Sequence, residues 1–146
     1  MPHPLFKRIT GFTLICLALN FGTSAATAEV VPVVSAKSSI SALSKNQIVN
    51  IFLENRGRFP DGSPALPIDQ EEGSTERNEF YTLYANRSAA QIKAHWSKII
   101  FTGRGQPPKT VPNSSDVIKR IAENPHAIGY IEKSLANDSV KVVIVK

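Results

Sequence analysis

Capped amphipathic helices and short apolar runs are mixed along most of this 146-residue chain, in the approximate order strand, helix, strand, three helices and two strands, and this mixture restricts the fold class. The clearest helix begins at Ser88, where Gln91 completes a capping box. Ser44 and Gln47 form the same motif at the start of an earlier helix. Short apolar runs that could form strands lie at 29–36, 65–70, 127–132 and 140–145. The sequence therefore predicts an α/β fold with a small mixed sheet flanked by about four helices.

Proline and glycine set the expectations for the segments between these runs. Pro32 lies inside the first apolar run and has no backbone N–H to donate. We therefore expect that run to form an edge strand or a mobile start. Residues 102–113 are rich in Gly and Pro and are expected to form a loop.

The first 28 residues have the pattern of a secretory signal peptide. Lys7 and Arg8 precede an apolar segment at 11–22, and an Ala-Thr-Ala site follows at 26–28. An uncleaved anchor is the alternative, but the apolar segment is shorter than the roughly 20 residues that a spanning helix needs. The expected organisation is a signal peptide at 1–28 and a domain at 29–146, in the periplasm and with no membrane span after cleavage.

Cys16 is the only cysteine of the chain, and it lies inside the apolar segment of the leader. The mature domain would therefore contain no thiol. This excludes a disulfide, a cysteine nucleophile and a cysteine metal ligand. A domain of this size has to be stabilised by its hydrophobic core alone.

Charge excludes one class of partner. The mature chain carries 15 Lys and Arg against 12 Asp and Glu, a formal charge of about +3. These basic residues form no consecutive block and no stripe interleaved with aromatic residues. We therefore expect no nucleic-acid binding.

Few residues offer catalytic or metal-binding chemistry. His95 and His126 are far apart and have no companion at ligand spacing, and His95 is expected to pack at the edge of the core. No serine lies in a nucleophile elbow, and no pair of carboxylates suggests acid–base work. The expectation is a protein that is not an enzyme and that needs no metal or cofactor.

Anion binding has more support, because three segments are rich in backbone N–H groups. They are a Gly-Ser-Thr helix start with an arginine one turn in, a glycine-rich segment able to form a nest, and a later Asn-Ser helix start. Ordinary caps and turns are the alternative for each of them. The candidate residues are Gly73, Ser74, Thr75, Arg77, Gly103, Arg104, Asn113 and Ser114.

The chain from about residue 40 to 132 resembles the phosphate-type periplasmic substrate-binding proteins of ABC transporters. The resemblance depends on Leu43-Ser44, Ile51-Phe52-Leu53 and, later, Pro125 followed by Ala127-Ile128-Gly129-Tyr130. It implies a single lobe of a type 2 periplasmic-binding-protein-like fold. It also implies phosphate or another small oxyanion as ligand and an ABC permease as partner.

The chain departs from that family in three respects. Full-length members have two lobes and clamp phosphate between them, whereas this chain holds about one lobe. The phosphate loop S-D-G-S-G-T of the family corresponds here to 71–75, which is one residue shorter and has an added carboxylate. His126 stands where the family usually has glycine.

Two functions remain open. The first is an exported substrate-binding or accessory component of a phosphate transport system that binds the oxyanion weakly through Ser74, Thr75 and Arg77. The alternative is a ligand-free interaction module derived from one lobe, which binds a second copy or a membrane protein. Glu71 and Glu72 bear on the choice, because a carboxylate about 4 Å from a phosphate opposes binding by roughly 1 kcal/mol in water and about 4 at an effective dielectric of 20.

Overall fold

The computed structural model describes residues 28–54 and 57–146, and the leader expected at 1–28 lies almost wholly outside them. A five-stranded sheet has the order β4-β3-β5-β1-β6, and β2 and β7 form a separate pair. The strands are β1 (Val30–Ser35), β2 (Ala42–Leu43), β3 (Leu66–Gln70), β4 (Lys109–Val111), β5 (Ala127–Glu132), β6 (Val140–Val142) and β7 (Ile144–Val145). The mixed α/β fold expected from the sequence is confirmed.

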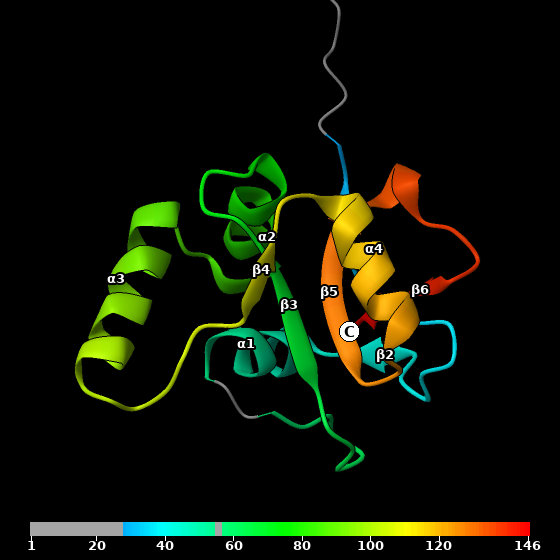
Figure 1. The fold of residues 1–146 in the computed structure, drawn as a ribbon, viewed down its shortest axis with the longest axis horizontal. Helices are drawn as coiled ribbons and strands as arrows, with labels where there is room; N and C mark the ends of the chain where they lie inside the picture. Colours follow the sequence, from blue (N-terminus) through cyan, green and yellow to red (C-terminus); the bar gives the residue numbers. More distant parts are fainter. Residues whose placement is uncertain (1–27, 55–56) are drawn as a thin grey trace, which may run out of the picture.

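The described residues form four α-helices. They are α1 (Lys45–Leu53), α2 (Thr75–Ala85), α3 (Ala89–Phe101) and α4 (Ser114–Glu123), and a short 3-10 turn, η1, spans Lys133–Leu135. Helices α1, α2 and α4 lie against the sheet and α3 lies to one side of it, as Figure 1 shows. Both predicted capping boxes are present at the starts of α1 and α3. Among the described residues, no helix has the length and apolar character required to cross a membrane.

The first strand lies inside the sheet, which corrects the expectation that Pro32 would mark an edge strand. β1 is antiparallel to β5 on one side and to β6 on the other. Pairing with β6 begins only at Val33, one residue after the proline. On that side the Pro32 carbonyl accepts the Val143 N–H at 2.9 Å. The return bond of this pair would need the N–H that Pro32 lacks, so the ladder with β6 ends there.

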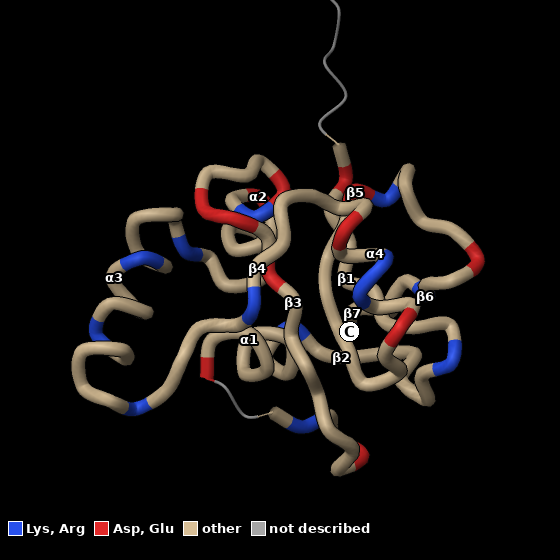
Figure 2. Tube along the Cα trace, in the orientation of Figure 1, with Lys and Arg blue, Asp and Glu red and all other residues tan. Residues whose placement is uncertain are grey.

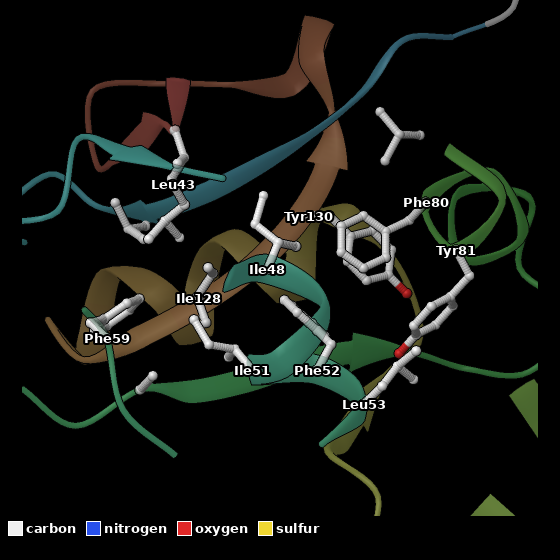
Figure 3. Packing of buried hydrophobic residues seen from close by; sticks show 14 of the residues in the cluster. Leu43, Ile48, Ile51, Phe52, Leu53, Phe59, Phe80, Tyr81, Ile128 and Tyr130 are labelled. Atoms are coloured by element: carbon white, nitrogen blue, oxygen red, sulfur yellow. The ribbon is translucent and has the colours of Figure 1, made fainter. Parts of the chain in front are cut away.

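The sheet separates two hydrophobic clusters. On one face Val34, Ile128 and Tyr130 pack with residues of α1 and α2, and Figure 3 shows this packing around Phe52 and Phe80. The opposite face packs against α4. Successive side chains of β1 and β5 point to opposite faces of the sheet and contribute to both clusters, as expected for strands buried on two faces.

Two predicted elements differ from the structure. In α2, the spacing of Phe80 and Leu83, three positions apart, predicts that both point inward, but Leu83 is 49% exposed and Tyr81 is buried instead. Part of the expected loop at 102–113 forms β4, which pairs in parallel with β3. The three residues of β4 form a strand only because they pair with β3, and the local sequence does not reveal this pairing.

Candidate functional site

The starts of α2 and α4 are joined by a side chain from the end of β3. Gln70 is fully buried, and its amide oxygen lies 3.2 Å from the Ser74 hydroxyl at the start of α2. Its amide nitrogen lies 3.3 Å from the Ser114 hydroxyl at the start of α4. Two of the three segments expected to bind an anion therefore meet at Gln70, a residue that the sequence analysis did not single out.

Ser74 and Arg77 are bound within the protein. The Ser74 hydroxyl caps α2 by accepting the Arg77 backbone N–H at 3.0 Å. The Arg77 guanidinium donates from Nη1 to the Gln70 carbonyl at 2.8 Å and lies 3.6 Å from the Asp69 carboxylate. It also lies over the ring of Tyr81, 5.6 Å from its centroid. These contacts hold Arg77 in one orientation and use part of its donor capacity.

Asp69 forms the centre of this network and is buried, with only 1% of its surface exposed. Its carboxylate accepts from the Tyr81 hydroxyl at 2.7 Å, from the Tyr130 hydroxyl and from the Gln70 N–H at 2.8 Å. Three donors and the nearby guanidinium compensate for removing the carboxylate from water.

The two tyrosines of the network respond to the same burial. Burial first, and then the charge of Asp69, raises the pKa of Tyr130 far above its usual value. The pKa of Tyr81 is also raised, mainly by burial and by Asp69, while Arg77 opposes the shift. Both phenols therefore remain protonated donors at neutral pH. Sequence reasoning missed Asp69, Tyr81 and Tyr130; a carboxylate inside a short strand candidate was the available signal.

A groove of about 360 Å³ opens beside this network, between the start of α2, α3 and β4. Arg77, Lys93 and Trp96 line it together with Glu71 and Glu72. The indole N–H of Trp96 is buried and has no hydrogen-bond partner among the residues that the structure describes. An unsatisfied buried donor costs free energy unless water or a ligand accepts from it.

The charges of the groove are close to balanced. Lys93 and the carboxylate of Glu72 form an exposed ion pair at 3.2 Å. Glu71 adds a second carboxylate, and Arg77 brings a guanidinium that already faces Asp69. The groove therefore offers hydrogen-bond donors without a strong positive charge.

The remaining candidate residues lie outside the network. Gly103 and Arg104 end α3, where their N–H groups donate to the carbonyls of Ile100 at 3.1 Å and Ile99 at 3.0 Å. Gly103 adopts a left-handed φ of +66°, as glycine after a helix commonly does. The N–H groups expected to form a nest are thus used to close the helix. Asn113 caps α4 by accepting the Asp116 N–H at 3.0 Å.

Gly73 and Thr75 flank Ser74 at the start of α2. Gly73 has a φ of +93°, which lets the chain turn sharply from β3 into the helix. Thr75 is the first residue of α2. Together they shape the loop that places Ser74 beside Gln70.

The histidines take no part in a metal site in the described part of the chain, where no cluster of three potential ligands exists. His95 is half-buried at the edge of the core, as expected, with Nε2 2.8 Å from the Leu53 carbonyl and Nδ1 3.4 Å from Arg87. This geometry requires the proton on Nε2 in the neutral ring, since a carbonyl only accepts. His126 is exposed.

The fold is shared with solved phosphate-binding proteins. A phosphate ABC transporter substrate-binding protein from Clostridium perfringens, solved with bound phosphate, matches with a TM-score of 0.63 and 20% identity over 80% of this chain. An ABC-type phosphate transport receptor from Vibrio cholerae matches at 0.62 and 17%, and PstS from Borrelia burgdorferi at 0.59 and 14%, each over 80% of this chain. At these identities the likeness concerns the fold.

Sequence comparison adds no relative: neither a family model nor a curated protein matches the chain. The match covers 44%, 45% and 47% of the three solved chains, so this protein spans less than half of their length. The chain therefore has the fold of one lobe of the phosphate-binding proteins of ABC transporters.

Proposed function

We propose that the chain is an exported, single-lobe oxyanion-binding protein that serves as a substrate-binding or accessory component of a phosphate transport system. The observation that supports this most is the groove that Arg77 and Trp96 both line, because the Arg77 guanidinium is fixed in orientation and the buried Trp96 indole N–H has no partner among the described residues. Both groups donate hydrogen bonds, and a phosphate oxygen accepts them.

Binding at this groove is weak. The carboxylates of Glu71 and Glu72 line the same space and repel an anion. Each such repulsion, about 1 to 4 kcal/mol at 4 Å, can offset one charged hydrogen bond of about 1.5–3 kcal/mol. The internal contacts of Arg77 further reduce what its guanidinium can give to a ligand.

Isothermal titration of phosphate into the chain from Glu29 to Lys146 tests the proposal. We expect a dissociation constant in the millimolar range, as two or three partly opposed hydrogen bonds would give. Trp96→Phe removes the indole N–H and keeps an aromatic ring, so phosphate affinity should fall about fivefold or more. Arg104→Gln is the control, since Arg104 lies outside the groove, and it should bind as the wild type does. No heat at tens of millimolar phosphate contradicts oxyanion binding.

A second candidate function follows from the closed network. Because Gln70 connects Ser74 to Ser114, polar groups at the starts of two helices are satisfied without any ligand. This favours an interaction module whose partner is a second copy or an ABC permease. Sedimentation velocity with and without phosphate separates the two: phosphate-independent dimers support the module, and sub-micromolar phosphate binding by a monomer contradicts it.

The proposed export is tested separately. Mass spectrometry of the protein recovered from the periplasm of an expressing bacterium should show a chain that begins at Glu29. A chain that retains residues 1–28 and remains in the membrane fraction would favour the uncleaved anchor.

A further inference from the structure

One segment of the chain contains basic residues and no acidic ones. Residues 80–115 contain five Lys and Arg and no Asp or Glu. The rest of the chain from Glu29 onward carries ten basic and twelve acidic residues. The positive excess therefore belongs to α3 and its flanks, and Figure 2 shows blue and no red along this helix.

One face of α3 points away from the rest of the protein. Ile92 and Trp96 are buried on the inner side. Figure 1 shows the helix at one side of the molecule, apart from the sheet. The outer side carries residues four, three, four and three positions apart, a spacing that keeps them on one helix face. These residues are Arg87, Gln91, Ala94, Lys98 and Phe101, and all of them are exposed.

The C-terminal end of this face is strongly apolar. Phe101 is 93% exposed, and the adjacent Ile100 is 52% exposed. Arg104 follows in the exposed loop after the helix. A phenyl ring held in water beside basic side chains is unfavourable for a free surface and suits an amphipathic boundary.

Not every basic residue of the segment 80–115 belongs to this surface. Lys93 is on the flank that borders the groove, where it pairs with Glu72. Arg87 and Lys98 instead border a shallow hollow together with Ala94, in which no acidic side chain takes part. We define the α3 outer face as Arg87, Ala94, Lys98, Phe101 and Arg104.

We propose that the α3 outer face binds the surface of an anionic phospholipid membrane. Arg87, Lys98 and Arg104 pair with lipid phosphates, and Phe101 inserts at the boundary between headgroups and acyl chains. The binding is peripheral and involves no spanning segment. An acidic protein surface would pair equally well with the basic side chains. Such a surface would also need a preformed pocket for the projecting phenyl ring, whereas a fluid lipid interface needs none.

Vesicle co-sedimentation of the chain from Glu29 to Lys146 tests this. That part contains every described helix, strand and core residue and lacks the apolar leader, which would bind lipid by itself. Vesicles of phosphatidylcholine with 30% phosphatidylglycerol are compared with pure phosphatidylcholine. We expect binding to the anionic vesicles only, and weaker binding as salt is raised.

Three variants locate the surface. Lys98→Gln with Arg104→Gln should weaken binding by roughly tenfold to thirtyfold, at about fivefold for each base lost. Phe101→Ser should weaken it about tenfold. Lys119→Gln with Arg120→Gln is the matched control, because it removes the same charge from exposed positions on α4. The control should retain most of the binding, and circular dichroism should show all variants folded.

Several outcomes overturn the proposal. Equal binding to neutral and anionic vesicles would show that the charge of the α3 outer face does not drive binding. Equal losses of binding in the Lys98/Arg104 and Lys119/Arg120 double variants would show that only the net charge of the protein matters. No binding to either vesicle, together with dimers that Phe101→Ser abolishes, would show that the face serves a second copy of the chain. No binding and no association would show that the face has no such partner. Phosphate affinity is independent of every one of these outcomes, so the proposed oxyanion site is judged separately.

Discussion

Asp69 carries a charge in the protein interior, and its neighbours make this possible. Its carboxylate accepts hydrogen bonds from two phenols and a backbone N–H, and the guanidinium of Arg77 lies beside it. Removing one partner of a buried charged pair leaves the other uncompensated, which typically costs about 3–5 kcal/mol. The position is therefore a sensitive point of the fold.

We predict that Asp69→Asn lowers the free energy of unfolding by about 2–4 kcal/mol, because Arg77 loses its counter-charge and the phenols lose their charged acceptor. Urea unfolding followed by circular dichroism measures the change. Asp138→Asn is the control at an exposed position and should shift the free energy by less than about 0.5 kcal/mol. Equal effects of the two substitutions would show that the network contributes nothing particular.

The buried tyrosines predict a loss of stability at high pH. In the folded protein, burial and the charge of Asp69 raise the pKa values of Tyr81 and Tyr130 above the usual value of 10.0. Unfolding therefore releases protons above pH 10, and stability that is fully present below that pH is lost as pH rises. The two groups together give a slope of about −2.7 kcal/mol per pH unit.

Urea midpoints measured between pH 9 and 11.5 check this slope. Tyr81→Phe removes one of the two groups, so the slope should fall to about half. An unchanged slope in this variant would mean that Tyr81 ionises equally in the folded and unfolded chain.

At this scale the sequence predicts local contacts and misses distant ones. The capping role of Ser74 follows from its position before a helix, and the structure contains it. The contact of Asp69 with Tyr130 joins residues 61 positions apart, and no local pattern encodes it. The inward position of Tyr81 depends on the rotation of α2 against the core, which propensity alone does not set.

At the scale of elements, α4 lies tightly against the sheet at Gly129. A Cβ atom added there would lie 2.6 Å from Val117 Cγ1 and 3.0 Å from Ile121 Cδ1. Such distances are shorter than atoms tolerate, so helix or strand has to move. The glycine in the Ala-Ile-Gly-Tyr motif thus has a packing reason.

Gly129→Ala should therefore destabilise the protein by about 1–3 kcal/mol in urea unfolding. Val117→Ala removes the side-chain atom nearest to the added methyl group. The double variant should be more stable than the sum of the two single effects allows, with a coupling of at least about 0.5 kcal/mol. Strict additivity would show that the methyl group is accommodated elsewhere.

The elements themselves differ in how far the sequence predicts them. The capping boxes at Ser44 and Ser88 define two helix starts from four adjacent residues each. The strand β4 could not be found in the same way, because its three residues gain their structure from pairing with β3. The spacing of Ile92, Trp96 and Ile100 predicts an inward Ile100, but Ile100 is 52% exposed and the core reaches only to Trp96 and half-buried Ile99.

For the whole molecule, the strand order predicts which truncations the fold tolerates. β5 lies between β3 and β1 and contacts both. A chain that ends after Glu123 lacks β5 and should show no cooperative unfolding transition in urea. A chain that ends after Val143 keeps the five-stranded sheet and should still unfold cooperatively. A folded protein after the first truncation would contradict the central role of β5.

The overall architecture follows from sequence better than the site does. Helical patterns and apolar runs occur along most of the chain, so α/β class and helix number are predictable. The groove beside Arg77 depends on how α3 packs against the starts of α2 and β4, and this packing is set by side chains from three elements. Its balanced charge could not be read from the sequence order of its residues.

The pairing of β1 with β5 also determines how early the sheet can form during synthesis. Val31 pairs with Ile131, so the first strand waits for a partner made 100 residues later. At about 5–20 residues per second, that wait lasts about 5–20 s during synthesis. Until then four valines of β1 lack the strand that shields them, and the sheet cannot close. A chain with this order stays unfolded while it is being made, which is the state in which a secreted polypeptide has to pass through a membrane.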